Sequence, residues 1–346
     1  MAVLPSYIKF PSDPSTGLNE ILASFQPDLV ALIVDENTEE HCLPQLNLDV
    51  DPIVLRIPSG EAHKTITTCQ SLWVGMTAHN LSRSSLVVTL GGGVIGDLGG
   101  FVAATYKRGV RFVNVPTTLL SQVDASIGGK LGIDFDGLKN HVGVFKEPDA
   151  VLLCPGFLRT LPERQLISGF AEVLKHGLIW DAKYWASIQS FGTTGFDNWE
   201  HMLRRSVEIK SEIVEKDPLE SGLRKILNFG HTLGHAVETW HLENGLDLLH
   251  GEAVAAGMIM ESFLSMETNG LGNQEMDYIV EVVSRHFAKI ERFPDMPELM
   301  SLLSQDKKNT GEEINFSLLQ SLGRCDYNRR VSEIQIRKSV EYYQSL

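Results

Sequence analysis

Cysteine is scarce in this sequence of 346 residues, and the four cysteines that occur stand far apart. Cys42, Cys69, Cys154 and Cys325 form no C-x-x-C pair, which fits buried reduced thiols better than a disulfide framework or a cysteine zinc site. The sequence also lacks a run of about 18 apolar residues, and its opening "MAVLPSYIKFPSD" has no signal-peptide core. We therefore expect a cytoplasmic protein without a membrane anchor.

Excess positive charge is also missing. Lys and Arg total 30 against 44 Asp and Glu, so the formal net charge is −14. Nucleic acids and anionic membranes attract proteins through a basic field, so we expect neither as a partner. An anionic small molecule would have to bind at a local group of basic residues. No repeat or low-complexity tract occurs, and the length exceeds the roughly 250 to 300 residues at which single cores stop growing, so we expect two domains.

The two halves of the chain differ in their apolar patterns. Up to about residue 160, short β-branched runs such as "LVALIVDEN" and "SLVVTLGGG" alternate with helical stretches, as in buried parallel sheets. This predicts an α/β, Rossmann-like nucleotide-binding domain over residues 1–160. From there, "ERQLISGFAEVLKHGLI" and "EAVAAGMIMESFLSM" place apolar residues three and four positions apart. Residues 161–346 are therefore predicted to form a mostly α-helical domain that binds metal and substrate.

A glycine-rich segment in the first half suggests a phosphate site. Gly91, Gly93 and Gly96 form a G-x-G-x-x-G pattern between a predicted strand and an apolar helix, where the backbone can approach a pyrophosphate. Tight helix packing accounts for the pattern about equally well. Other predicted strand ends in this half offer polar groups to a ribose. These groups belong to Asp35, Asn37, Glu61 and Lys64.

Four of the eleven histidines fall within twenty positions, at His231, His235, His241 and His250. His231 and His235 are four residues apart and would share a helix face, which suggests zinc, although a pair of surface histidines is the alternative. In "AEVLKHG", Glu172 lies on an apolar helix with a lysine three residues on. A carboxylate with two or three histidines would make a divalent-metal site with an open position.

Basic and amide residues are predicted to lie in glycine-rich, otherwise apolar loops. In "RKILNFGH", Arg224, Asn228 and His231 are each about one helical turn apart. Any one basic residue would normally be a solvated surface charge, but in an acidic protein the set favours a phosphorylated or carboxylated substrate. The other members of the set are Arg108, Asp124, Lys130, Lys139, Asn140, Lys175 and Lys210.

Several long motifs resemble those of 3-dehydroquinate synthase, in the sugar phosphate cyclase superfamily. They are "GGGVIGDLGGFVAATYKRGVRFVNVPTTLLSQVDASIGGKLGID", "KNHVGVF", "LPERQLISGFAEVLKHGLI", "LRKILNFGHTLGHAVE" and "HGEAVAAGM". The match runs in register from about Asp35 to Met258, and beyond it only "DKKN" at 306–309 can be placed.

The resemblance implies an NAD- and metal-dependent lyase of the shikimate pathway, which leads to the aromatic amino acids. Such enzymes convert 3-deoxy-D-arabino-heptulosonate 7-phosphate (DAHP) into 3-dehydroquinate and phosphate. The substrate is oxidised and then reduced again on the enzyme, so NAD is regenerated in each turnover. Zinc is the usual metal, with cobalt as a substitute, and the expected assembly is a homodimer.

The resemblance also implies roles for individual residues. The metal ligands would be Glu172, His231 and His250, on two helices and a loop, while His235 would contact substrate. A long interval before His250 leaves His241 as a competitor for the third position. NAD would be held by Asp35, Asn37, Glu61, Lys64, Gly92, Gly93, Val94, Asp97, Thr117, Thr118, Lys130, Lys139 and, more weakly, Thr160 and Gln165. The remaining catalytic and substrate positions would be Asp124, Asn140, Lys175, Lys210, Arg224, Asn228, His235, and, nearer the phosphate, Arg108 and Lys308 or Lys307. Arg108 is expected to reach across the dimer interface.

One departure from the family and three alternative functions remain. Bacterial members commonly have "PLGKN" where this chain has "FDGLKN", so the segment before Lys139 is expected to bend differently. Another sugar phosphate cyclase would act on a substrate without a carboxylate, and would replace residues of the set that contains Lys210, Arg224, Asn228 and His235. A metal-dependent polyol dehydrogenase would release NADH and need no phosphate-binding group. A non-catalytic NAD- or metal-binding module would not need every catalytic-type position.

Overall fold

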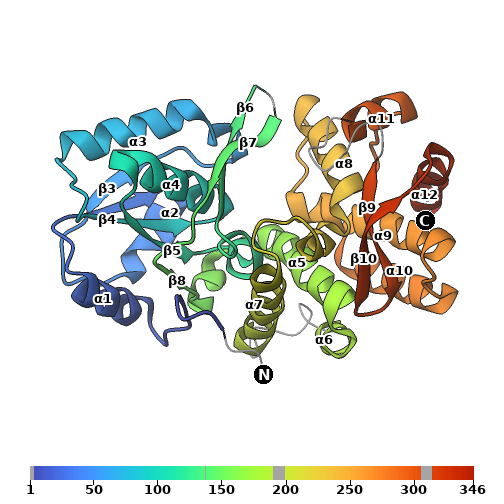
Figure 1. The fold of residues 1–346 in the computed structure, drawn as a ribbon, viewed down its shortest axis with the longest axis horizontal. Coiled ribbons are helices and arrows are strands. Elements are labelled where there is room, and N and C mark those ends of the chain that lie inside the picture. The colour runs from blue at the N-terminus through green and yellow to red at the C-terminus, as the bar shows by residue number, and fades with distance from the viewer. Residues whose placement is uncertain (1–3, 137, 190–198, 305–313) are drawn as a thin grey trace. The chain divides into compact units, whose positions relative to one another are not determined.

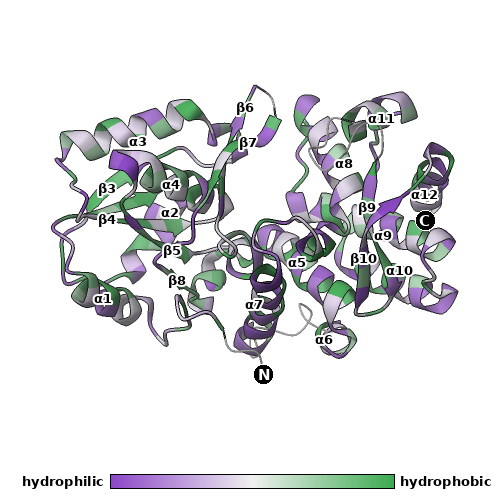
Figure 2. Cartoon of the chain, in the orientation of Figure 1, coloured by the Kyte–Doolittle hydropathy of each residue, from purple (hydrophilic) through white to green (hydrophobic). Residues whose placement is uncertain are grey.

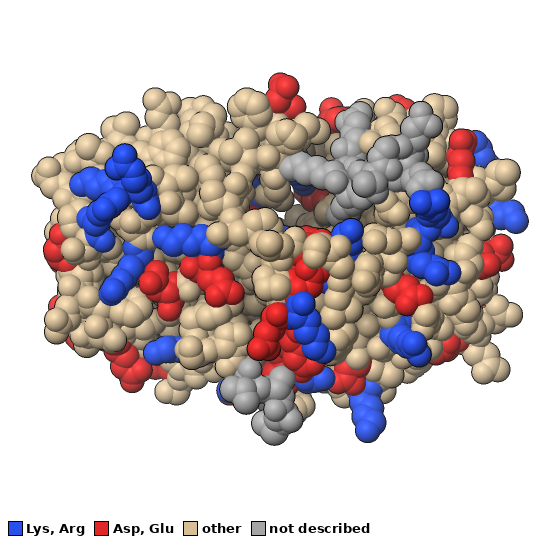
Figure 3. Space-filling model, in the orientation of Figure 1, with Lys and Arg blue, Asp and Glu red and all other residues tan. Residues whose placement is uncertain are grey.

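The computed structural model describes residues 4–136, 138–189, 199–304 and 314–346. The chain forms two compact units, Met1–Pro162 and Glu163–Leu346 (Figure 1). No helix among the described residues is long and apolar enough to span a membrane. On the face shown in Figure 3, acidic and basic side chains are interspersed among uncharged areas.

The first unit is built on a six-stranded parallel sheet in the order β1-β8-β5-β4-β2-β3. Its strands are β1 (Ile8–Lys9), β2 (Val30–Val34), β3 (Ile53–Arg56), β4 (Leu86–Gly91), β5 (Arg111–Pro116) and β8 (Ala150–Leu152). Every residue of β2, β4 and β8 is buried, which is why these strands form continuous apolar runs in the sequence (Figure 2). The structure thus confirms the predicted α/β fold.

Helices cover both faces of this sheet. They are α1 (Pro14–Phe25), α2 (Glu36–His41), α3 (Ile66–Ala78) and α4 (Gly93–Thr105). Ile33 of β2 belongs to a core cluster with residues of α3 and α4, and its neighbour Leu32 belongs to the cluster that contains α1. The alternation places a hydrophobic core on each side of the sheet, because successive side chains of a strand point to opposite faces.

The strand order changes direction between β2 and β4. From β2 the next strand, β3, is added on one side, and from β4 the strands β5 and β8 are added on the other. Open α/β sheets bind ligands at the carboxyl ends of the strands that flank such a switch point. Asp35 directly follows β2, and the glycines 91–93 lie at the end of β4.

Lys130, Lys139 and Asn140 lie on a β-hairpin rather than in the loops that the sequence suggested. Its strands β6 (Lys130–Phe135) and β7 (Leu138–Phe145) pair antiparallel. Leu131 and Ile133 are buried in the same core cluster as α4, so burial of alternate β6 residues stabilises the hairpin against the first unit.

The second unit is mostly helical, which confirms the prediction for this half. Its helices are α5 (Glu163–Trp180), α6 (Ala182–Ile188), α7 (Trp199–Lys216), α8 (His231–Glu243), α9 (His250–Thr268), α10 (Asn273–His286), α11 (Met296–Ser304) and α12 (Glu333–Ser345). An antiparallel hairpin adds β9 (Asn315–Ser321) and β10 (Arg324–Arg330). In α9 the run from 253 to 262 is buried throughout, so this helix forms the centre of the unit.

Candidate functional site

Three predicted metal ligands meet in the second unit. Glu172 lies on α5, His231 is the first residue of α8, and His250 is the first residue of α9 rather than part of a loop. Glu172 Oε1 is 3.4 Å from His231 Nε2 and 3.7 Å from His250 Nε2. Ligand atoms about 2.0–2.1 Å from a tetrahedral zinc ion are themselves about 3.4 Å apart. The two distances from Glu172 are therefore close to those between ligand atoms of one metal ion.

The rings of His231 and His250 are turned so that Nε2 faces Glu172. His231 Nδ1 lies 3.1 Å from the carbonyl oxygen of Phe229, and His250 Nδ1 lies 3.3 Å from Glu238 Oε2. Both oxygens are acceptors, so each Nδ1 is assigned as the N–H donor. The lone pair of each Nε2 is then available to a metal, as in carboxylate–histidine–metal arrangements.

Glu172 is held in its ionised form, which is the form that can bind a metal ion. Glu172 is fully buried and forms an ion pair with Lys175 one turn along α5. Burial opposes ionisation, but Lys175 and His231 hold the pKa of Glu172 well below its usual value. Neither oxygen of Glu172 has a hydrogen-bond partner of normal geometry among the described residues. A buried carboxylate in this state is costly, and a metal ion would complete its coordination.

The two histidines differ in charge in the metal-free protein. Burial and the nearby Lys175 lower the pKa of His231 to about 4, so its imidazole is neutral at pH 7. Burial also disfavours the charged form of His250, but Glu238 and Glu172 raise its pKa to about 10. A metal ion would have to displace the proton of His250, because only the neutral imidazole binds a metal.

His235 lies beside this group and could replace Glu172 in it. Its ring centroid is 4.9 Å from that of His231 and 5.5 Å from that of His250. Potential ligand atoms of these three histidines all lie within 4.8 Å of one another. The geometry brings the four side chains together, so the assignment of Glu172 as ligand and His235 as substrate residue stays a prediction.

His241 does not compete for the third position in this structure. Its Nδ1 donates to the carbonyl oxygen of Val237 at 2.9 Å, and its ring packs edge-on against Trp240. His250, and not His241, lies beside Glu172.

Glycines allow the three helices that carry the predicted metal ligands to touch. A Cβ atom on Gly251 would lie 1.8 Å from the carbonyl oxygen of Ser168 on α5. A Cβ atom on Gly257 would lie 1.9 Å from the carbonyl oxygen of Gly230, the residue before α8. Only glycine permits these approaches, so the motifs "HGEAVAAGM" and "NFGH" place α9 against both α5 and α8.

Three cations of the predicted substrate set are buried in the second unit. Relative exposure is 1% for Lys175, 6% for Lys210 and 2% for Arg224, which argues against solvated surface charges. Arg224 Nη1 donates to the carbonyl oxygen of Pro218 at 2.6 Å. The predicted role of these buried basic groups in binding an anionic ligand stays a prediction.

Arg224, Asn228 and His231 do not occupy successive turns of one helix, so the prediction from their spacing is wrong. Arg224 and Asn228 lie on a 3₁₀ helix, Leu223–Asn228, and Gly230 then turns the chain with φ 79°. The left-handed glycine separates this short helix from α8, which begins at His231. Asn228 donates to Glu220 Oε1 at 2.7 Å.

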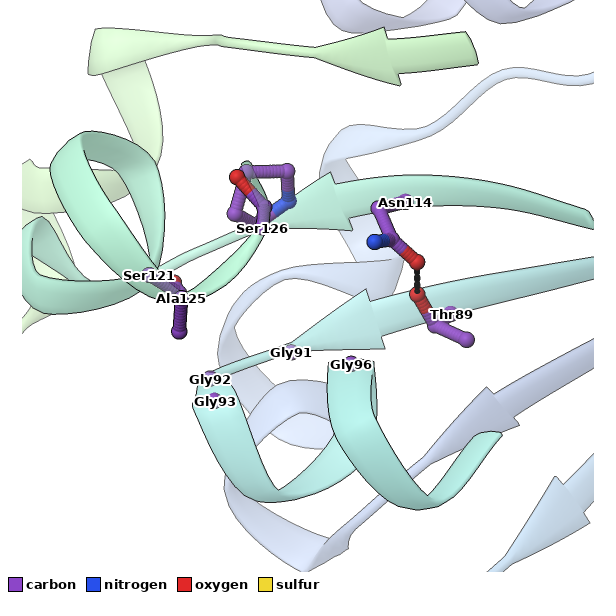
Figure 4. A pocket seen from close by; sticks show the side chains of 10 residues that line it. Thr89, Gly91, Gly92, Gly93, Gly96, Asn114, Ser121, Ala125 and Ser126 are labelled. Carbon is purple, nitrogen blue, oxygen red and sulfur yellow. Dashed lines mark hydrogen bonds between the residues drawn. The ribbon is translucent and has the colours of Figure 1, made fainter. Parts of the chain in front are cut away.

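In the first unit, the glycine-rich segment lines a cavity at the start of α4. Figure 4 shows Gly91, Gly92, Gly93 and Gly96 on one side of it, with Ser121 and Asn114 nearby. Gly92 supplies no side chain to cap α4, so the first N–H groups of the helix are available to a ligand. Helix N-termini of this kind bind phosphate groups.

The glycines of the motif serve different purposes. A Cβ atom on Gly91 would lie 2.3 Å from Ile95 Cδ1, so this glycine is required by packing. A Cβ atom on Gly96 would meet nothing within 4 Å, although Gly96 lines the cavity. Packing, one of the two alternatives for the motif, therefore explains Gly91 but not Gly96, and ligand binding at Gly96 stays a prediction.

Lys64 contacts three other predicted residues of the first unit through its Nζ. Its Nζ donates to Asp97 Oδ2 and to Asn140 Oδ1, both at 2.6 Å, and lies 4.0 Å from Glu61 Oε1. Burial lowers the pKa of Lys64, but Asp97 and Glu61 outweigh this effect and raise it. By contrast, Asp35 caps α2, where its Oδ1 accepts from the N–H of Thr38 at 2.8 Å. Asn37, next along α2, is exposed.

The other predicted residues are spread over several elements. Arg108 stands in a turn in which φ is 49° at Lys107, 68° at Arg108 and 113° at Gly109, a costly backbone for non-glycine residues. Lys307 and Lys308 lie outside the described residues, as does Gly137 of "FDGLKN". Val94 is on α4, Thr117 and Thr118 follow β5, Asp124 is in the helical turn Ser121–Ala125, Lys130 and Lys139 are on the hairpin, and Thr160 ends the 3₁₀ helix Pro155–Thr160. Gln165 lies on α5 in the second unit. The roles of these residues stay predictions.

Sequence analysis did not single out Glu238, the partner of His250. Glu238 lies three residues after His235 on α8 and therefore faces the same side of the helix. That spacing was the signal that could have identified it.

Comparison with known protein families gives two adjoining matches. Residues 54–168 match the model described as 3-dehydroquinate synthase N-terminal, and residues 169–309 match the model described as 3-dehydroquinate synthase C-terminal. The chain is 39% identical to the 3-dehydroquinate synthase of Parabacteroides distasonis over 338 residues, which cover 96% of each protein.

Solved structures show the same fold. The structure of ValA, a 2-epi-5-epi-valiolone synthase from Streptomyces hygroscopicus with NAD⁺ and Zn²⁺ bound, is similar with a TM-score of 0.87 and 27% identity. The similarity covers 100% of this chain and 99% of that one. A 2-deoxy-scyllo-inosose synthase, solved with carbaglucose-6-phosphate, NAD⁺ and Co²⁺, has a TM-score of 0.83 at 21% identity, covers 99% of this chain and 100% of its own, and supports the fold alone.

Proposed function

The chain belongs to the 3-dehydroquinate synthase family, and we propose that it catalyses the reaction of that name, converting DAHP into 3-dehydroquinate and phosphate. This makes it a carbon–oxygen lyase of the shikimate pathway. The observation that carries the proposal is the meeting of Glu172, His231 and His250 at ligand spacing, with Lys175 paired to the carboxylate. The family match over almost the whole chain supports the choice of substrate.

The proposed cofactors are NAD and zinc, with cobalt as a substitute for zinc. NAD would supply a reversible hydride acceptor, and the metal would supply a Lewis acid that polarises a substrate hydroxyl. Glu172, His231 and His250 would hold the metal. The exposed N–H groups at the start of α4 would bind the pyrophosphate of NAD. The choice of NAD and zinc as cofactors is supported by the similar structure of ValA, which has NAD⁺ and Zn²⁺ bound.

Side chains of the second unit would recognise and orient the acid substrate. Arg224 can bind a carboxylate through two parallel N–H groups, and Asn228 can donate a further hydrogen bond. Lys210 and Lys175 would contribute positive charge in a buried setting, where charge is poorly screened. His235, beside the proposed ligands, would contact substrate and the departing phosphate.

The two units would bind different ligands. We propose that residues 1–160 hold NAD and residues 161–346 hold metal and substrate, a division supported by the unit boundary at Pro162. We also propose a homodimer in which the strained turn at Arg108 presents its guanidinium to the partner's substrate. A cytoplasmic location is supported by four free cysteines, as expected in a reducing compartment.

The alternative with specific support is another sugar phosphate cyclase, since a valiolone synthase shares the fold at 27% identity. The two functions differ in the substrate carboxylate, for which the buried Arg224 is suited. A polyol dehydrogenase is disfavoured by the predicted basic set, because a neutral polyol carries no carboxylate or phosphate for Arg224 to bind.

One assay separates the three functions. Zinc-loaded protein is mixed with DAHP and an amount of NAD far below the substrate, and released phosphate and NADH absorbance are followed together. We expect many phosphates per NAD with no lasting NADH signal. Steady accumulation of NADH would identify a dehydrogenase. In the same assay with a second substrate, preference for a heptulose phosphate without a carboxylate over DAHP would identify another cyclase.

A further inference from the structure

The helix that begins with the proposed ligand His231 has an unusual cap. The residue before α8 is Gly230, in the left-handed region, and it has no side chain with which to bind the first N–H groups. Two N–H groups at this end of the helix are instead bound by the side chain of Glu261, which lies on α9. Glu261 Oε2 accepts from the N–H of Gly230 at 2.7 Å, and its Oε1 accepts from the N–H of Leu233 at 3.0 Å.

This cap is fully enclosed by protein. Glu261 has no exposed surface, and it lies one turn after Gly257, where α9 and the start of α8 are in backbone contact. A carboxylate at a helix N-terminus is stabilised by the N–H groups and by the helix dipole. Because charge-assisted hydrogen bonds are short and directional, Glu261 fixes the direction in which α8 leaves Gly230.

Fixing Gly230 and Leu233 also fixes His231 between them. The acceptor that orients the ring, the carbonyl oxygen of Phe229, precedes Gly230 directly. Glu261 therefore controls both the position of the His231 backbone and the position of the oxygen that holds its Nδ1–H. The outcome is the approach of His231 Nε2 to Glu172 Oε1 at 3.4 Å.

We propose that Glu261 is a positioning residue of the metal site, which preorganises His231 by capping α8 from α9. This inference rests on the proposed role of His231 as a metal ligand. Substitution of a residue that orients a metal ligand without touching the metal typically lowers metal affinity by about 10- to 100-fold. A purely structural cap would change the stability of the fold and leave metal affinity unaltered.

Glu275 provides a matched control in the same unit. It also accepts from two backbone N–H groups, that of Gly272 at 3.1 Å and that of Leu322 at 3.0 Å, but it lies on α10 and contacts no proposed ligand. Glu261→Gln and Glu275→Gln each replace one accepting oxygen by an NH₂ group that cannot accept. Each variant therefore loses one hydrogen bond from a backbone N–H group, a buried one in Glu261→Gln and an exposed or partly buried one in Glu275→Gln.

The test compares zinc affinity, measured by competition with a chromogenic chelator, and the visible absorption of the Co²⁺-loaded proteins. In Glu261→Gln we expect zinc to bind about 10- to 100-fold more weakly and the Co²⁺ spectrum to change, while Glu275→Gln matches the wild type in both. If Glu261→Gln does not fold, Glu261→Asp, which keeps the charge on a shorter side chain, should show the same weakening.

The outcomes separate this inference from the proposed function. The positioning role alone would be overturned if the folded Glu261 variant kept the zinc affinity and the Co²⁺ spectrum of the wild type. Its stability would then fall as in Glu275→Gln. A wild-type protein that binds neither Zn²⁺ nor Co²⁺ would overturn the proposed metal site and this inference with it.

Discussion

Replacing Gly96 by alanine should stabilise the protein and weaken NAD binding at the same time. Gly96 lies inside α4, its φ is not positive, and a Cβ atom there would meet no protein atom within 4 Å. Alanine is favoured over glycine within a helix by about 0.5–1 kcal/mol. The free energy of unfolding of the NAD-free protein should therefore rise by about that amount.

The same methyl group would enter the cavity that we assign to the NAD pyrophosphate. A surplus methyl group in a fitted site costs about 1–3 kcal/mol. The dissociation constant for NAD should then rise by about 5- to 150-fold. Stability and affinity move in opposite directions, which a general loss of structure cannot produce.

The assay pairs denaturant unfolding without NAD with calorimetric titration of NAD. Gly156→Ala is the control, because Gly156 also has no atom within 4 Å of a Cβ position but is exposed and lines no part of this cavity. We expect it to leave NAD affinity unchanged. Unaltered NAD affinity in Gly96→Ala would refute the placement of the pyrophosphate, and lower stability would refute the account of α4.

Other predictions concern the second unit. His250→Ala should abolish stable zinc binding in equilibrium dialysis, whereas His241→Ala should retain one zinc per chain, and the reverse result would exchange their roles. Glu238→Ala removes the acceptor from His250 Nδ1–H and should weaken zinc by about 10- to 100-fold in chelator competition, and equal affinity would remove Glu238 from the site. Arg224→Lys keeps the charge but loses the planar fork, and should raise the KM for DAHP about tenfold or more while zinc and NAD affinities stay constant. Gly257→Ala would place Cβ 1.9 Å from the carbonyl oxygen of Gly230 and should cost at least about 1–3 kcal/mol in denaturant unfolding, so wild-type stability would contradict the helix contact.

The fold was predictable where a residue pattern follows one element. Buried parallel strands in the first half and helices in the second were both predicted correctly, since continuous apolar runs are typical of buried strands and three- and four-residue spacings are typical of amphipathic helices. The hairpin β6–β7 was missed, because its glycines and charged residues resemble a loop and its burial depends on contact with α4. Helix spacing also failed between Asn228 and His231, because the short helix ends at Asn228 and the left-handed Gly230 turns the chain before α8 begins.

The candidate site shows a similar limit. The family motifs pointed to Glu172, His231 and His250, and the structure brings them together. The residues that orient them could not be recognised from local patterns. Glu261 caps a helix that begins 30 positions earlier in the sequence, and such a contact exists only once α8 and α9 are packed.

The coordination of a bound zinc ion tests the central claim most directly. A crystal structure of the zinc-loaded protein, with anomalous scattering collected at the zinc absorption edge, would locate the ion and its ligands. We predict one zinc about 2.0–2.2 Å from Glu172 Oε1, His231 Nε2 and His250 Nε2, with His235 outside the coordination sphere. A zinc ion held by His231, His235 and His250, with Glu172 uncoordinated, would contradict the account.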